Sequence, residues 1–144
     1  MSENQQTSNK SERVMKAVQE WLSEEGYKCN VDSDGDFYFK YQGKTILFIK
    51  NENDDPKYYR LVMPGIYDIE DESELYRIED ICNDVSGEIK CVKAFVVKPN
   101  YSVWLAIEFF LDPDNFYLDS FFQSYLDIMI GAFHAVASKI VNKN

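Results

Sequence analysis

Hydrophobic residues recur at helical spacing over residues 14–22, and Gly26 supplies a stop signal, so the sequence predicts a first helix that ends near this glycine. Residues 27–31 and 37–41 then alternate between apolar and polar side chains on either side of an Asp34-Gly35 turn. This alternation around a glycine turn is typical of a β-hairpin. The helix is therefore expected to lead into two paired strands.

Two more strands are expected before the middle of the chain. A Gln42-Gly43 turn leads into residues 45–50, whose adjacent apolar side chains indicate a central strand with both faces at least partly covered. Residues 51–56 form a polar connection, and residues 58–63 form a fourth strand that Pro64-Gly65 is expected to close. The first half is thus one helix and four strands.

The second half opens with an acidic stretch, residues 68–74, that leads into helically spaced apolar residues. Asp71 and Glu74 have the spacing of a capping box, and their charges suit the positive end of a helix. The sequence therefore predicts a second helix over residues 75–85, which ends before Gly87.

Two strands and a long helix complete the predicted fold. Residues 89–98 and 102–111 flank a Pro99-Asn100 turn and should pair as a hairpin, and residues 121–140 carry a broad helical stripe of apolar side chains. The predicted order is α-β-β-β-β-α-β-β-α, an α+β fold with an antiparallel sheet packed by helices. Residues 1–10 are expected to be a flexible tail, and residues 11–144 a single α+β domain.

Composition narrows the classes of partner. The formal net charge of -10 repels nucleic acid and anionic membranes, so neither is expected as a partner. The apolar runs are shorter than the roughly 20 residues that cross a bilayer, and the polar N-terminus lacks a secretory signal, so the cytoplasm is the expected location. The three cysteines have no C-x-x-C spacing and are expected to be free and mostly buried.

No pattern in the sequence matches a known type of catalytic site. Asp32, Asp34 and Asp36 resemble the start of a calcium loop, but the glycine and glutamate that such a loop requires later are missing. His134 is the only histidine, and no glycine-rich phosphate loop occurs. Clusters of carboxylates in the loops fit solvated surface, and a divalent cation site or contacts with a basic partner are the alternatives. We expect no catalytic, cofactor-binding or metal-binding residues, and no enzyme activity.

The sheet face that points away from the predicted core is unusually aromatic. If the odd-numbered residues of strand 102–111 face the helices, Trp104 and Phe110 face away. Tyr38 and Tyr58 of earlier strands also face away if Phe37, Phe39 and Tyr59 point inward. An exposed aromatic face favours binding of a partner. Two other interpretations remain: the final helix or another subunit covers this face, or the register differs by one residue.

Several segments together resemble the YbjN-like family. These are the run FYFKYQG at residues 37–43, the run DDPKYYRLVMP at residues 54–64, and the helix at residues 75–85 before a hairpin and a long last helix. The resemblance implies a compact antiparallel sheet akin to the type III secretion chaperones and frequent self-association. It also implies a role in protein binding or regulation, with no catalytic residues.

The leading hypothesis is a non-enzymatic protein-binding domain, chaperone-like or regulatory, whose aromatic sheet face with an acidic rim binds another polypeptide or forms a homodimer. The alternative is a small-molecule binding or enzymatic domain with a pocket between the sheet and the C-terminal helix, where convergent polar groups would be needed. A calcium-responsive module around Asp34 is a third hypothesis.

Overall fold

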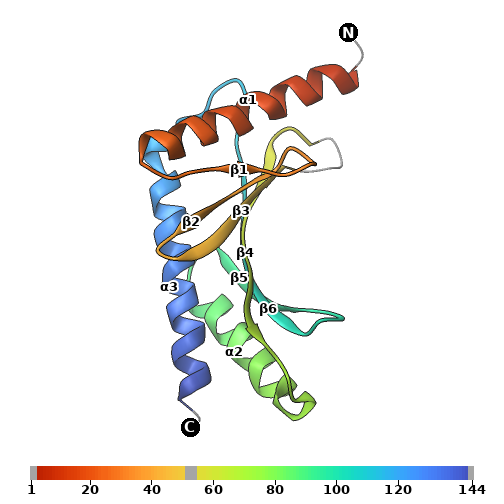
Figure 1. Ribbon diagram of the computed structural model, residues 1–144, viewed down its shortest axis with the longest axis vertical. Helices are drawn as coiled ribbons and strands as arrows, with labels where there is room; N and C mark the ends of the chain where they lie inside the picture. The colour runs from red at the N-terminus through yellow and green to blue at the C-terminus, as the bar shows by residue number, and fades with distance from the viewer. Residues whose placement is uncertain (1–2, 51–54, 143–144) are drawn as a thin grey trace. The chain divides into compact units, whose positions relative to one another are not determined.

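The computed structural model describes residues 3–50 and 55–142, which form an α+β fold (Figure 1). Six strands form one antiparallel sheet in the order β1-β2-β3-β4-β6-β5, and the order of elements along the chain is the predicted one. Two 3₁₀ turns, Glu72–Glu74 and Leu118–Ser120, precede the second and third helices. The helices and strands are α1 (Glu3–Glu24), β1 (Asn30–Val31), β2 (Phe37–Tyr41), β3 (Lys44–Lys50), β4 (Tyr58–Asp68), α2 (Leu75–Glu88), β5 (Val92–Val97), β6 (Ser102–Phe110) and α3 (Phe122–Val141).

Internal contacts divide the chain into two compact units, which we describe separately. Unit 1 comprises residues 1–61 and 108–122, and unit 2 comprises residues 62–107 and 123–144. Strands β4 and β6 each contribute a segment to both units.

Helix α1 of unit 1 ends where the sequence predicts. Gly26 adopts a φ of +95°, which side chains disfavour, and this lets the amide of Tyr27 donate to the carbonyl of Leu22 at 2.8 Å. The start differs from the prediction, because residues 3–10, expected as a flexible tail, are helical. Extending an existing helix costs far less than starting one, so a polar segment can continue a helix that is anchored further along.

The β1–β2 hairpin is confirmed, although β1 is only two residues long. The Oδ1 atom of Asp32 accepts the amides of Asp34 and Asp36 at 2.8 and 3.1 Å. The Oδ1 atom of Asp36 accepts the amide of Lys50 at 3.1 Å, and burial raises the pKa of this carboxyl. The acidic triplet therefore organises the turn, as short polar side chains do in such loops.

An aromatic cluster forms the core of unit 1. Phe48 lies at its centre, with its ring centroid 5.3 Å from that of Phe37 and 5.7 Å from that of Tyr59. The ring centroid of Phe48 also lies 6.1 Å from that of Phe109 and 6.0 Å from that of Phe122. All five side chains are buried, which confirms the inward orientation predicted for three of them, Phe37, Tyr59 and Phe109.

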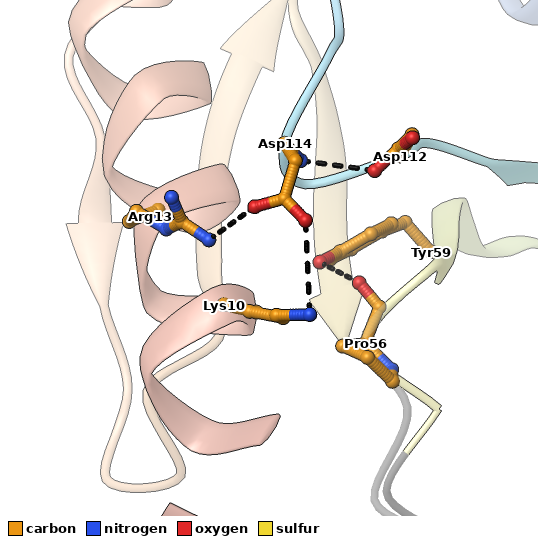
Figure 2. A network of polar contacts seen from close by, with 6 residues as sticks. All are labelled: Lys10, Arg13, Pro56, Tyr59, Asp112 and Asp114. Carbon is orange, nitrogen blue, oxygen red and sulfur yellow. Dashed lines mark hydrogen bonds and ion pairs between the residues drawn. The ribbon is translucent and has the colours of Figure 1, made fainter. Parts of the chain in front are cut away.

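A polar network joins α1 to the loop after β6 (Figure 2). The carboxylate of Asp114 accepts a hydrogen bond from the guanidinium of Arg13 at 2.9 Å and lies 3.7 Å from the ammonium of Lys10. The amide of Asp114 donates to Oδ1 of Asp112 at 3.0 Å. The hydrogen bond from Arg13 lowers the pKa of the Asp114 carboxyl, with Lys10 adding to the effect.

In unit 2, β4 extends further than predicted. Pro64-Gly65 was expected to close the strand, but β4 continues to Asp68. Gly65 adopts a φ of +59°, a conformation open to glycine at little cost, so the chain remains extended on both sides of it. Helix α2 is also longer than predicted, since it includes Gly87 and ends at Glu88.

The predicted capping box at the start of α2 is half formed. The side chain of Asp71 accepts the amide of Ser73 at 2.9 Å and caps the short 3₁₀ turn that leads into the helix. The carboxylate of Glu74 instead accepts the hydroxyl of Tyr67 at 3.2 Å and lies 3.8 Å from the guanidinium of Arg77. Glu74 therefore links β4 to α2 rather than completing the box.

Strands β5 and β6 form the predicted hairpin, in which Ala94 is opposite Leu105 and Phe95 is opposite Trp104. Because β5 is the last strand in the sheet order, one of its sides has no neighbouring strand. Helix α2 contacts β5, and the hydroxyl of Ser86 bonds both backbone groups of Ala94. The helix thereby protects part of an edge that would otherwise be open to pairing.

Candidate protein-interaction surfaces

The outer face of the sheet in unit 1 carries three of the four residues predicted to bind a partner. Tyr38 is 39% exposed and Phe110 is 71% exposed, while Tyr58 is half-buried. Strand alternation explains the exposure of Tyr38, because buried and exposed residues alternate strictly along β2 and Tyr38 occupies an exposed position. The register assumed from the sequence is therefore confirmed in this strand.

Tyr58 and Phe110 pack against each other on this outer face. Their ring centroids lie 5.7 Å apart with an interplanar angle of 67°, an edge-to-face arrangement. The hydroxyl of Tyr58 donates to the carboxylate of Glu108 on β6. Burial, followed by this carboxylate, raises the pKa of Tyr58 to about 12, so the phenol is neutral and can donate at physiological pH.

The charged groups on this face are mixed in sign. Lys40 is exposed on β2, and its ammonium donates to the hydroxyl of Thr45 at 2.5 Å. Arg60 lies near Tyr58, and Glu108 bonds the Tyr58 hydroxyl. Strand alternation thus places two cations and one carboxylate among these described residues of the face, and the acidic rim around it stays a prediction.

Trp104, the fourth predicted residue, belongs to unit 2. It is half-buried on β6 opposite Phe95 of β5, and its indole nitrogen donates to the hydroxyl of Ser102 at 2.9 Å. Because the indole N–H already has a hydrogen-bond partner, partial burial of the Trp104 side chain leaves no unsatisfied donor. We therefore treat Tyr38, Tyr58 and Phe110 as one surface, the unit 1 aromatic face.

A second feature of interest is an apolar hollow of about 220 Å³ in unit 2. It lies between the end of β4 and the C-terminal half of α3, and Tyr67 supplies the only polar side chain of its lining. The sequence suggested a pocket between the sheet and the final helix, but none of its residues was identified. The broad apolar stripe of α3 is the feature of the sequence that could have indicated them. The lining residues are Ile66, Tyr67, Phe133, Val136, Ala137, Ile140 and Val141.

The remaining reactive side chains do not assemble into a site. His134 is exposed on α3 and contacts the ring of Phe133. Within residues 3–50 and 55–142, no three His, Cys, Asp or Glu residues are grouped so that they could hold a metal ion. Cys82 is buried, Cys29 is half-buried and Cys91 is exposed, so the expectation of mostly buried thiols is wrong. Cys91 lies in the turn before β5 with a φ of +70°, outside any packed element.

Among the described residues, one helix is long and apolar enough to cross a membrane by length and composition alone. This helix is α3, whose most apolar window has a mean hydropathy of 1.2 and is 28% buried. The apolar runs judged from the sequence were shorter, because Asp127 and His134 bound the run at residues 128–133 within the same helix. Core helices of soluble proteins pass the same test, so the finding is weak support for a membrane span.

Comparisons with known proteins support the fold and not a function. No family model and no curated protein matches the sequence, so membership of the YbjN-like family stays a prediction. The chain is similar in structure to an uncharacterized protein from Methanothermobacter thermautotrophicus, with a TM-score of 0.56 and 16% sequence identity. The similarity covers 89% of this chain and 96% of that one. At this identity the two proteins share a fold.

Proposed function

We propose that the protein is a non-enzymatic binding domain, chaperone-like or regulatory, which holds another polypeptide or a second copy of itself on the unit 1 aromatic face. The supporting observation is Phe110, which is 71% exposed although it lies in a strand and packs edge-to-face against Tyr58. Aromatic side chains dominate binding energy where they become buried between proteins. A rigid ring pair also loses little side-chain entropy on binding.

The chemistry of this face also suits a polypeptide. An ammonium and a guanidinium lie on the same face as the aromatic rings, so the face offers several hydrogen-bond donors beside apolar surface. Protein interfaces combine an apolar centre with polar groups at the rim in this way. Arginine and tyrosine are among the residues most enriched at such interfaces.

The test compares Phe110→Ser with Tyr117→Ser, which alters another aromatic residue of unit 1 that is 73% exposed and lies outside the sheet. Tagged protein is used to isolate partners from the lysate of the source organism, and native mass is measured on the same eluate. We expect a stoichiometric polypeptide, or a dimer, with the wild type and with Tyr117→Ser, and its loss with Phe110→Ser. An unchanged complex with folded Phe110→Ser would rule out this face.

The small-molecule alternative would use the apolar hollow of unit 2. Sites for metabolites usually combine an apolar wall with several placed polar groups, whereas this lining offers one hydroxyl, that of Tyr67. That hydroxyl already bonds Glu74. We therefore place the small-molecule function second. Specific loss of a bound metabolite on filling the hollow would reverse that order.

A further inference from the structure

We propose that the apolar hollow between β4 and α3 binds an apolar side chain from a basic amphipathic helix of a partner polypeptide. This inference rests on the proposed protein-binding function but on different residues. It concerns unit 2 alone, whereas the unit 1 aromatic face carries the preceding proposal.

The size of the hollow indicates a side chain as its occupant. Small-molecule pockets usually enclose roughly 300–1,000 Å³, and this hollow encloses about 220 Å³. That space suits one bulky aliphatic or aromatic side chain. Helical ligands bind in this way, with one or two apolar residues set into a groove formed by apolar side chains.

Two large apolar side chains are exposed in the wall of the hollow and at the start of α2. Val141 lines the hollow and is 77% exposed, and Tyr76 at the start of α2 is 81% exposed. The guanidinium of Arg77, the residue after Tyr76, donates to the backbone carbonyl of Ile140, which places the start of α2 at the end of α3. A highly exposed apolar side chain in the wall of a hollow, as Val141 is, marks an interaction site more strongly than one that stands alone on the surface.

The charges beside the hollow decide the kind of partner. Residues 68–74, which directly follow the lining residue Tyr67, contain five carboxylates and no basic residue. Among the described residues beside the hollow, the cations Arg77 and Lys139 are already paired: Arg77 lies 3.8 Å from Glu74, and Lys139 lies 3.3 Å from Glu88. The uncompensated charge is therefore negative, and it attracts lysine and arginine residues that flank an apolar anchor.

The same charge argues against two other occupants. An anionic lipid surface would be repelled by the carboxylates of residues 68–74. A second copy of the chain, docked with the same patch facing itself, would bring two such acidic stretches together. A helix with leucine on one face and lysine on the other satisfies both the hollow and its rim.

The test measures binding of a fluorescent leucine–lysine model helix by anisotropy. Ala137→Phe fills the hollow, and Ser124→Phe makes an equal addition at an exposed position of α3 outside it. We expect Ala137→Phe to weaken binding by about tenfold or more and Ser124→Phe to leave it unchanged. Val141→Ser, at a highly exposed lining position, should weaken binding as well and guards against misfolding of Ala137→Phe.

The charge requirement is tested by Glu70→Lys combined with Glu72→Lys. Glu20→Lys with Glu24→Lys changes the net charge equally on α1 and serves as the control. The Glu70→Lys, Glu72→Lys variant should bind the helix more weakly than wild type at low salt, and this difference in affinity should shrink as the salt concentration is raised.

Equal binding by wild type and folded Ala137→Phe, or equal binding of a leucine–glutamate helix, would overturn the proposal. So would stronger binding to anionic vesicles, or dimerisation that Ala137→Phe abolishes. None of these results tests the unit 1 aromatic face, whose role is tested separately by Phe110→Ser.

Discussion

The side-chain hydroxyl of Ser86 makes two hydrogen bonds to a single residue, Ala94. It accepts from the Ala94 amide at 2.8 Å and donates to the Ala94 carbonyl at 3.3 Å. Ala94 lies in the middle of β5, the last strand in the sheet order, so both bonds satisfy groups that a neighbouring strand would otherwise bond. A helical serine thus replaces part of a strand at this edge.

Replacing Ser86 with alanine should lower the free energy of unfolding by about 1–3 kcal/mol, because buried Ala94 would lose partners for both backbone groups. Urea unfolding measures the loss, and hydrogen exchange should show faster exchange of the Ala94 amide. Ser86→Thr keeps the hydroxyl and should be milder, while Ser124→Ala at an exposed site of α3 should change stability by less than about 0.5 kcal/mol. Unaltered exchange at Ala94 in Ser86→Ala would contradict this account.

Phe48→Ala should destabilise the protein by about 3–5 kcal/mol, since it opens a cavity where four other aromatic rings meet. Thermal or urea unfolding gives the value. Tyr117→Ala removes a ring that is 73% exposed and should cost less than about 0.5 kcal/mol. Similar losses for both variants would show that the aromatic cluster is not the main source of stability in unit 1.

The contact between Arg13 and Asp114 should make stability depend on pH. The hydrogen bond from Arg13 lowers the pKa of Asp114 in the folded state. The contact therefore stabilises the folded state at pH values above the unfolded-state pKa of Asp114, which is about 4. This stabilisation is lost as the pH falls through the lower folded-state pKa. We expect Asp114→Asn to have a lower urea midpoint than wild type at neutral pH, and the difference to disappear in strong acid.

Arg13→Gln provides the matched variant, because it removes the other partner of the same contact. The double variant should lose little more stability than Asp114→Asn alone, because that variant already removes the charge that contacts both Arg13 and Lys10. A difference between wild type and Asp114→Asn that stays constant with pH would assign the effect to packing and not to charge.

The cysteines should react with iodoacetamide in a fixed order. Cys91 is exposed, whereas burial, with a smaller effect of Glu79, raises the pKa of the buried Cys82 thiol to about 11. Peptide mapping at mildly alkaline pH should show Cys91 modified first, and Cys82 modified only on unfolding. Cys91→Ser should remove the fast phase. Rapid modification of Cys82 in folded protein would contradict the burial of that side chain.

The sequence by itself determined the element order and, in the strands, the choice of inward side chains. Alternation predicted that Phe37 and Phe39 are buried and Tyr38 is exposed, because successive side chains of a strand point to opposite faces. Gly26 ended α1 as predicted, since its φ of +95° requires the freedom of glycine. These are local rules that need no knowledge of the rest of the fold.

Local rules failed at three positions. Pro64-Gly65 was predicted to end β4, and Gly87 to follow α2, yet each lies inside its element. Glu74 had the spacing of a capping residue but bonds Tyr67. At Glu74 the hydrogen bond from Tyr67 replaces a capping contact worth roughly 1 kcal/mol, and a single glycine costs a helix only about 1 kcal/mol, which α2 tolerates at Gly87.

The candidate surfaces show the same division. The sequence identified Tyr38, Tyr58 and Phe110 as outward-facing, because strand alternation is enough to place them on one face. The hollow in unit 2 was decided by tertiary structure alone, since Ile66 and Tyr67 come from β4 and Val141 from the end of α3, far apart in the sequence. No periodic pattern records how closely two such segments pack, because that distance depends on the side chains between them.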